Sequence, residues 1–268
     1  MLVDQIMSGL ERKAADRTPT RRIGAHNVGT CVRKLWYTVH GYPTEPLSGR
    51  TIALFDLGDR VEDAVMEFIE QSGVAHVRGR RDQDKVAVPE IGGGNVVADF
   101  FFEHEGEQLV GEIKSMSDFA YVRAERGEID EQYLCQVEVY MRAYKVRRAV
   151  IIAYRKETSH ICEVVVERDD DRWARVKMNA TLACCDDLPP RPYQPAVDCE
   201  ECGGTGKTPA KGLPHKACEG TGKLPYGPII PRFPCGYCGF REACWGELKQ
   251  TFDAKGRPVW RVVGDGAA

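Results

Sequence analysis

The chain has 268 residues, of which 43% are hydrophobic and 29% are charged, a composition typical of a globular protein. Its net charge is −3, which excludes a strongly basic protein that coats nucleic acid along its whole surface. No apolar run reaches the roughly 18 residues that a membrane helix needs, and Asp4 interrupts the apolar start of a secretion signal. We therefore expect a cytoplasmic protein with no membrane partner.

Hydrophobic periodicity predicts a mixed order of helices and strands. Helical spacing covers 2–15, 27–39 and 52–71. Strand patterns follow at 85–88, 95–102 and 108–114, with Gly92, Gly93 and Gly94 as the turn between the first two. A helix at 131–144, strands at 149–155 and 161–167, and a helix at 172–185 complete the order. Helices that flank a strand-rich centre predict a single α/β core.

Charged residues in the predicted strands indicate a candidate active site. Glu112 and Lys114 are two residues apart, so their side chains project from the same face of one strand. Asp99 is the single acid of the apolar segment 95–102, where a buried carboxylate is costly unless a cation compensates it. We expect Asp99 and Glu112 to bind Mg²⁺ or Mn²⁺, with Lys114 orienting or helping to deprotonate the attacking water. The alternative is an ordinary surface pair of Glu112 and Lys114.

Two helices add polar residues to this pattern. Glu62 follows Gly58 on the long helix 52–71, and we interpret Gly58 as a close-packing glycine. On the helix 131–144, Tyr133, Gln136 and Tyr140 share one face at positions i, i+3 and i+7. A glutamine between two aromatic residues is unusual for pure core packing, so this face is a candidate part of the site.

The order G-x3-E, D, E-x-K, Q-x3-Y resembles the RecB-type branch of the PD-(D/E)XK nucleases. The resemblance implies an α/β, restriction-endonuclease-like core with a mixed central sheet flanked by helices. In that family the acids bind the metal, the lysine serves catalysis, and the Gln/Tyr helix positions the site and the DNA. The catalytic residues implied here are Glu62, Asp99, Glu112, Lys114, Gln136 and Tyr140. The implied ligands of Mg²⁺ or Mn²⁺ are Glu62, Asp99, Glu112 and the carbonyl group of Ile113.

The sequence departs from the family pattern at two positions. Ala98 stands where the proline that names the family belongs, and Glu62 occupies a position that is often histidine. The first replacement is common in this branch. The second leaves it open whether Glu62 binds the metal directly.

Eleven cysteines without a secretion signal argue for metal ligands in a reducing cytosol rather than for disulfides. Cys235, Cys238 and Cys244 form a C-x2-C-x5-C group, which supplies three thiolate ligands. No cysteine follows Cys244, so a fourth ligand must come from earlier in the chain. Cys31 is the candidate, with Cys184 or Cys185 as alternatives. All-thiolate ligation suits zinc or an iron–sulfur cluster, and the spacing alone does not choose between them.

A distant N-terminal cysteine followed by a C-terminal C-x2-C-x5-C group resembles the iron–sulfur clamp of certain RecB-type nucleases. Among these are the CRISPR-associated adaptation exonucleases and their phage relatives. The resemblance implies a 4Fe–4S cluster held by Cys31, Cys235, Cys238 and Cys244. Such a cluster would join the two ends of the nuclease domain, so its loss should loosen the whole domain.

A second cysteine group contains an internal repeat. Cys199-x2-Cys202 recurs as His215-x2-Cys218, and each unit continues with one residue and then Gly-Thr-Gly-Lys. Four ligands from two such knuckles predict a closed, structural Zn²⁺ site, and the pattern resembles half of the DnaJ cysteine-rich module. The alternative is a flexible loop with idle cysteines. We expect a nuclease domain over 1–196 and 227–268, with a zinc-knuckle insertion at 197–226.

These features together predict metal-dependent hydrolysis of a DNA phosphodiester bond. The family resemblance implies exonucleolytic action on single-stranded or frayed ends, in recombination, repair or CRISPR-type DNA processing. It also implies a bacterial or phage-infected host cell and protein partners from those processes. Two alternatives stay open: a catalytically silent DNA-binding or adaptor protein on the same fold, and a sequence-specific endonuclease.

Overall fold

The computed structural model describes residues 2–15, 21–74, 76–78, 85–193, 199, 202, 205, 207–208, 212–213, 215, 229–231, 234–252 and 258–263. The chain forms two compact units: unit 1 is Met1–Gly41 with Pro46–Pro189, and unit 2 is Tyr42–Glu45 with Pro190–Ala268. The segments 197–226 and 227–268 both fall within the residue range of unit 2, and their assignment to a zinc knuckle and to the nuclease domain stays a prediction. Within the described residues, none of the helices combines the length and apolar character of a membrane span.

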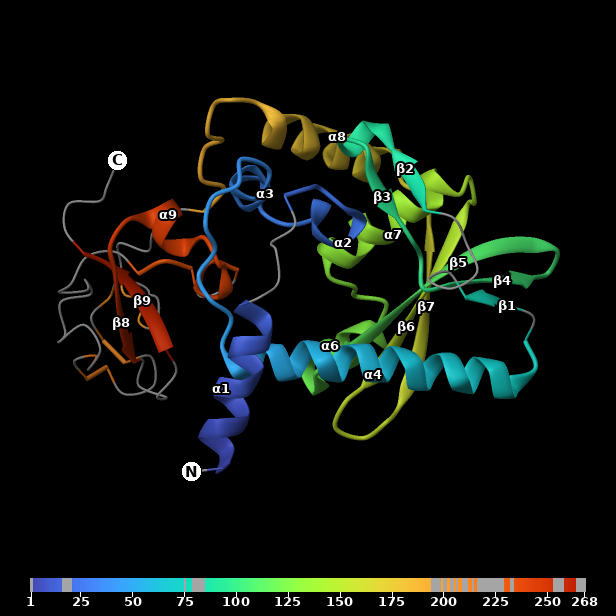
Figure 1. Cartoon of the computed structure of the whole chain (residues 1–268), viewed down its shortest axis with the longest axis horizontal. Coiled ribbons are helices and arrows are strands. Elements are labelled where there is room, and N and C mark those ends of the chain that lie inside the picture. The colour runs from blue at the N-terminus through green and yellow to red at the C-terminus, as the bar shows by residue number, and fades with distance from the viewer. Residues whose placement is uncertain are drawn as a thin grey trace. The chain divides into compact units, whose positions relative to one another are not determined.

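Unit 1 is built on a five-stranded mixed sheet with the order β1-β4-β5-β6-β7. The strands are β1 (His76–Arg78), β4 (Phe100–His104), β5 (Glu107–Met116), β6 (Arg148–Arg155) and β7 (Ile161–Glu167). The central strands β5 and β6 are parallel, and the other three pairs are antiparallel. The sheet and its flanking helices confirm the predicted mixed α/β architecture, which is compatible with a nuclease fold (Figure 1).

A hairpin outside this sheet contains the predicted glycine turn. Strand β2 (Val86–Val88) is followed by the 3-10 helix η1 (Pro89–Ile91) and pairs antiparallel with β3 (Gly94–Val96). Gly92 and Gly93 turn the chain with φ angles of +83° and +72°, which side chains with a Cβ rarely adopt.

Four of the five predicted helices, those expected over 2–15, 52–71, 131–144 and 172–185, are present in unit 1. The described helices of unit 1 are α1 (Leu2–Ala15), α2 (Ala25–Val28), α3 (Val32–Val39), α4 (Gly49–Ser72), α6 (Asp118–Ala124), α7 (Glu131–Ala143) and α8 (Asp170–Cys184). The prediction of a single helix over 27–39 is wrong, because α2 ends at Val28 and α3 begins only at Val32. A Cβ atom at Gly29 would lie 2.8 Å from Cys135 Cβ on α7, so the backbone presses on α7 there. Helix α6 has no counterpart among the predicted elements.

The sheet of unit 1 lies between two layers of helices. Val61 and Val65 of α4 pack with Phe100, Ile113 and Val150 on one face of the sheet. The other face packs against α6 and α7, and α2 and α8 pack on α7 within the same larger core cluster. Because side chains alternate along a strand, odd-numbered Ile113 faces α4, whereas its even-numbered neighbours in β5 face α7.

A buried carboxylate joins the two helices α7 and α8. Glu138 is fully buried, and its two oxygens accept hydrogen bonds from Arg142 Nε at 2.7 Å and from the Asp169 backbone amide at 3.0 Å. Arg172 Nη1 lies 3.5 Å from the same carboxylate. Since Asp169 is the N-cap of α8, Glu138 fixes where that helix begins.

Replacing Glu138 by alanine should therefore lower the free energy of unfolding by about 1–3 kcal/mol, because the Asp169 amide loses its acceptor, whereas the two arginines keep their partners Asp170 and Asp169. Urea denaturation followed by circular dichroism measures the loss. The exposed Glu163 of β7 is the matched control, and Glu163→Ala should change stability by less than about 0.5 kcal/mol. Equal stability of the two variants would contradict the assigned role of Glu138.

Unit 2 has a small core of its own. It contains the 3-10 helix η4 (Cys235–Tyr237), α9 (Arg241–Trp245) and the antiparallel pair β8 (Leu248–Phe252) and β9 (Pro258–Val262). Ile230, Cys235, Trp245 and Val262 form its buried cluster. The guanidinium group of Arg241 pairs with Glu45 and stacks on Trp260 at 3.9 Å from the ring centroid, which ties segment 42–45 to this unit.

Candidate active site

Strand β5 carries the two central charged residues of the site. Glu112 and Lys114 both face α7, and Glu112 is buried with 3% of its surface exposed. Lys114 Nζ donates a hydrogen bond to Glu112 Oε1, so the two opposite charges are in direct contact. The surface-pair alternative is therefore wrong for Glu112, whose carboxylate lies inside the protein.

Asp99 lies between two strands and not within one, contrary to the strand predicted over 95–102. The chain leaves β3 at Val96 and enters β4 at Phe100, and the pairing of β4 with β5 starts at Phe100 opposite Gly111. The backbone amide of Ile113 therefore has no partner in β4, and it donates to Asp99 Oδ2 at 2.8 Å. This bond brings the Asp99 carboxylate next to the backbone of β5, beside Glu112.

Helix α7 holds Glu112 from the opposite side. Gln136 Nε2 donates to Glu112 Oε1 at 2.8 Å and also lies 2.9 Å from the hydroxyl group of Tyr140. Gln136 and Tyr140 are four residues apart and share one face of the helix, as their spacing predicts. The helix thus fixes the orientation of the Glu112 carboxylate.

Helix α4 contributes Glu62 to the same cavity, which encloses about 730 Å³ and also includes Asp99, Glu112 and Ile113 in its wall. The interpretation of Gly58 as a close-packing residue is wrong. A Cβ atom built at Gly58 has no heavy atom within 4 Å, and Gly58 itself lines the cavity.

The site has more buried negative charge than its lysine balances. Burial raises the pKa of Asp99 well above its usual value, and the nearby charges of Glu112 and Glu62 raise it further. Burial by itself lowers the pKa of Lys114, but Glu112 and Asp99 outweigh this effect, so its pKa lies above the usual value. Burial and the same two carboxylates also keep the pKa of Tyr140 well above its usual value. Lys114 is thus a cation and Tyr140 a neutral phenol.

An unpartnered carboxylate oxygen is the feature of this site that a divalent cation would satisfy. Glu112 Oε2 is buried and accepts no hydrogen bond, whereas Oε1 accepts two. An unsatisfied charged oxygen inside a protein costs several kcal/mol unless a cation binds it. Oxygen ligands are the preference of Mg²⁺ and Mn²⁺. Asp99 and Glu112, with the carbonyl group of Ile113, are the residues that could hold such an ion. The carboxylate oxygens of Glu62, Asp99 and Glu112 do not all lie within 4.8 Å of one another, so the role of Glu62 as a ligand stays a prediction.

The cavity wall also contains residues that the sequence pattern did not assign to the site. His26, Phe55, Tyr133 and Lys156 line the cavity, and Lys114 Nζ lies 4.9 Å from the ring centroid of Tyr133. Burial lowers the pKa of His26, and the positive charges of Lys114 and Lys34 lower it further, so the imidazole is neutral near pH 7. Tyr133 shares the helical face of Gln136 and Tyr140. No spacing in the sequence connects His26, Phe55 or Lys156 to the site.

The repeated cysteine unit forms a compact ligand group in unit 2. The ligand atoms of Cys199, Cys202 and His215 all lie within 4.8 Å of one another, and all three residues are buried. Cys199 Sγ is 3.5 Å from His215 Nδ1. The fourth predicted ligand, Cys218, lies outside the described residues. Two soft sulfur atoms and an imidazole suit Zn²⁺, so the described part of the group fits the predicted metal.

The C-x2-C-x5-C group also lies in unit 2. Cys235 is buried in its core, Cys238 directly follows η4, and Cys244 lies in α9. Cys31 is the N-cap of α3 in unit 1. The Sγ atoms of Cys235, Cys238 and Cys244 do not all lie within 4.8 Å of one another, so a metal or cluster shared by them, like the ligand set that includes Cys31, stays a prediction.

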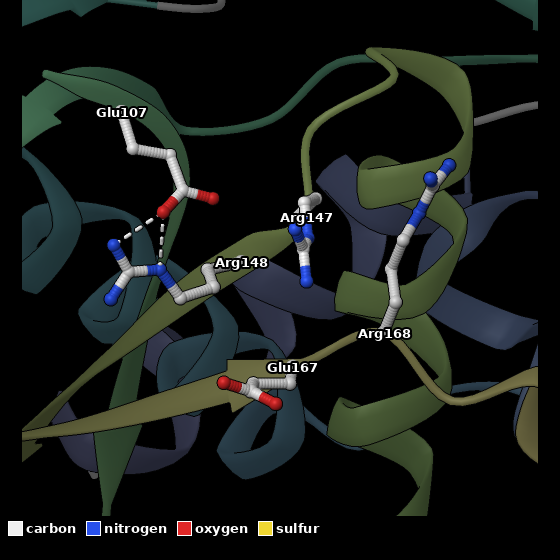
Figure 2. A pocket seen from close by; sticks show the side chains of 5 residues that line it. All are labelled: Glu107, Arg147, Arg148, Glu167 and Arg168. Atoms are coloured by element: carbon white, nitrogen blue, oxygen red, sulfur yellow. Dashed lines mark hydrogen bonds and ion pairs between the residues drawn. The ribbon is translucent and has the colours of Figure 1, made fainter.

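A second hollow of unit 1 has a different character. It encloses about 300 Å³ at the start of β5 and β6 and the end of β7, as Figure 2 shows. Its wall consists of Glu107, Arg147, Arg148, Glu167 and Arg168. Glu107 accepts a hydrogen bond from Arg148 Nε at 2.7 Å, and Arg168 donates to the carbonyl group of Met141 at 3.2 Å. Its arginines are thus largely engaged by the protein itself, and it has no cluster of acids for a divalent ion.

Comparisons with known proteins give a distant likeness in structure. No protein-family model and no curated protein matches the sequence. An alkaline exonuclease from Laribacter hongkongensis shares 14% identity at a TM-score of 0.46, over 66% of this chain and 90% of that chain. The same exonuclease in complex with dAMP has an equal TM-score of 0.46 over 67% of this chain. A phage-related exonuclease from Haemophilus somnus shares 15% identity at a TM-score of 0.38, over 57% and 77% of the two chains. Because these scores are low, the functional inference rests on the site and not on the likeness.

Proposed function

We propose that the protein is a metal-dependent deoxyribonuclease that degrades single-stranded or frayed DNA from an end. The observation that supports this proposal is the state of Glu112. One of its oxygens is fixed by Lys114 and Gln136, and the other is buried without a partner in a cavity shared with Asp99. A carboxylate arranged in this way is ready to bind a hard cation.

The residues of the chain have separate tasks in this proposal. A bound Mg²⁺ or Mn²⁺ would polarise the phosphate and lower the pKa of the attacking water. Lys114, whose pKa Glu112 and Asp99 raise, would orient a phosphate or water oxygen as a hydrogen-bond donor. Gln136 keeps the Glu112 carboxylate in one orientation. The resemblance of the sequence motifs to RecB-type nucleases supports DNA as the polymer that is cut.

The experiment is degradation of end-labelled, linear single-stranded DNA beside a circular single strand of the same sequence. With Mg²⁺ or Mn²⁺ the linear strand should shorten while the circle stays intact, and EDTA should stop the reaction. Cutting of the circle would identify an endonuclease instead. If neither substrate is cut with either metal, the protein is a silent DNA-binding or adaptor protein and the proposal is wrong.

The two cysteine groups of unit 2 are proposed to hold different metals. Cys199, Cys202, His215 and Cys218 would bind one Zn²⁺. Cys235, Cys238 and Cys244 would bind one 4Fe–4S cluster, with Cys31 as the fourth ligand that the family resemblance implies. Anaerobically purified protein should then be brown and contain both iron and zinc. Metal analysis should show that Cys202→Ser loses the zinc and keeps the iron, whereas Cys235→Ser does the reverse. Colourless wild-type protein with zinc in both groups would replace the cluster by a second zinc site.

A further inference from the structure

An apolar surface lies at the rim of the cavity that contains the acids. Leu54 and Phe55 of α4 line this cavity, and 48% and 57% of their surfaces are exposed. The core contact of α4 is made instead by Val61, Val65 and Met66. Single exposed apolar side chains are common on protein surfaces, but these two belong to the wall of the proposed active site.

The position of Phe55 on the helix relates it to the acids. Phe55 and Glu62 are seven residues apart, which is two turns of an α-helix, so they lie on the same face about 10 Å apart along the axis. Gly58 lies between them on this face, and a Cβ atom there would meet nothing within 4 Å. Gly58 therefore leaves open space on this face between the aromatic ring and the carboxylate, beside the exposed side chain of Asp59, which also lines the cavity.

A flat apolar ring beside an open surface is suited to bind the face of a nucleobase. Every base has a π-face, so stacking of this kind is independent of sequence, whereas a base inside a duplex is already stacked on both sides. The same cavity contains the ammonium group of Lys114 and is also lined by Lys156, which can bind the phosphates that flank such a base.

We propose that Phe55, with Leu54 and the open surface at Gly58, forms a binding site for one unpaired nucleobase of the strand being cut. This inference rests on the proposed nuclease function and adds to it a reason for the preference for single strands. Stacking at Phe55 would hold the nucleotide near the scissile phosphate and would reject an intact duplex. The occupant has to be unpaired, but it can be any of the four bases.

The test measures binding of single-stranded oligonucleotides that carry the fluorescent base 2-aminopurine at successive positions from the end. All proteins carry Glu112→Gln, so that the DNA stays intact. Phe55→Ala should weaken binding by about 5- to 100-fold and restore the fluorescence that stacking quenches at one position. Phe55→Trp should keep both the affinity and the quenching.

The matched control is Phe68 on the same helix, which is 48% exposed and does not line the cavity. Phe68→Ala should bind like the parent protein. An oligonucleotide that lacks the base at the quenched position should bind equally well to the parent and to Phe55→Ala. If Phe55→Ala and Phe68→Ala give the same affinity and the same fluorescence, the nucleobase site does not exist.

Failure of this inference differs from failure of the proposed function. Wild-type protein that cuts linear DNA, with Phe55→Ala as active and as tightly bound as Phe68→Ala, would remove the nucleobase site and keep the nuclease. A quenched base that depends on Phe55 in a protein that cuts no DNA would remove the nuclease and keep a single-strand-binding site.

Discussion

Glu112→Gln should lower the rate of DNA hydrolysis by at least about 10³-fold, because metal stabilisation of the transition state is worth several kcal/mol. Glutamine has the size of glutamate, and its carbonyl oxygen can still accept hydrogen bonds from Lys114 or Gln136. What it lacks is the negative charge, including that on the buried Oε2 atom, which accepts no hydrogen bond from the protein. The rate of release of labelled nucleotides at saturating Mn²⁺ measures the effect.

Glu103 of β4 supplies the control for this variant. Its side chain is exposed on the same sheet and does not line the acid cavity. Glu103→Gln should have the activity of the wild-type protein. If Glu112→Gln retains more than a tenth of that activity, the assignment of the metal site to Glu112 is wrong, whatever the activity of Glu103→Gln.

Asp99→Asn should abolish activity and at the same time stabilise the metal-free protein. The asparagine oxygen can still accept the hydrogen bond from the Ile113 amide, which the wild-type carboxylate accepts at 2.8 Å. Removal of the charge relieves the burial cost and the repulsion from Glu112 and Glu62 that raise the pKa of Asp99. Each kcal/mol by which Asp99→Asn raises the free energy of unfolding should raise the melting temperature in EDTA by about 2–4 °C.

The stabilisation should depend on pH in a definite direction. The pKa of Asp99 is higher in the folded than in the unfolded protein, so between these two values the folded state binds the additional proton. Wild-type stability therefore falls as the pH rises through this window, and the advantage of Asp99→Asn grows with it. At a pH below the ordinary aspartate pKa the two proteins should melt alike.

Added Mn²⁺ distinguishes a metal site from general destabilisation. It should raise the melting temperature of the wild-type protein, because a ligand that binds only the folded state stabilises it, and it should have little effect on Asp99→Asn. Equal melting temperatures of both proteins in EDTA across the pH range would show that the charge of Asp99 does not destabilise the folded state. Equal stabilisation of both by Mn²⁺ would show that Asp99 is not a ligand.

Regular periodicity was enough to predict the long elements of unit 1. Helix α4 was predicted over 52–71 and spans Gly49–Ser72, because its apolar residues repeat with the helical period over six turns. In β5, the two-residue period alone puts Glu112 and Lys114 on one face. In α7, the spacing of Gln136 and Tyr140 likewise puts them on one face. Each of these predictions depends on a period within a single element.

The points at which elements break could not be predicted in this way. The apolar run 95–102 looks like one strand, but β3 pairs with β2 whereas β4 pairs with β5, so the chain must turn at Val97–Asp99 between the two partners. The break between α2 and α3 falls where Gly29 closely approaches α7. Both involve a neighbour distant in sequence, which a local pattern does not contain.

The amino-acid sequence by itself determined which residues share a strand or helix face, since the geometry of a single element follows from its own period. It also indicated the chemistry, through an acid and a lysine in one strand and cysteines at ligand spacing. Only the tertiary structure decided that Asp99 binds the Ile113 amide, that Gln136 fixes Glu112, and that Phe55 and Gly58 open onto the acids. The physical reason is that a side chain's direction is local, whereas its partners and its desolvation depend on how distant segments pack.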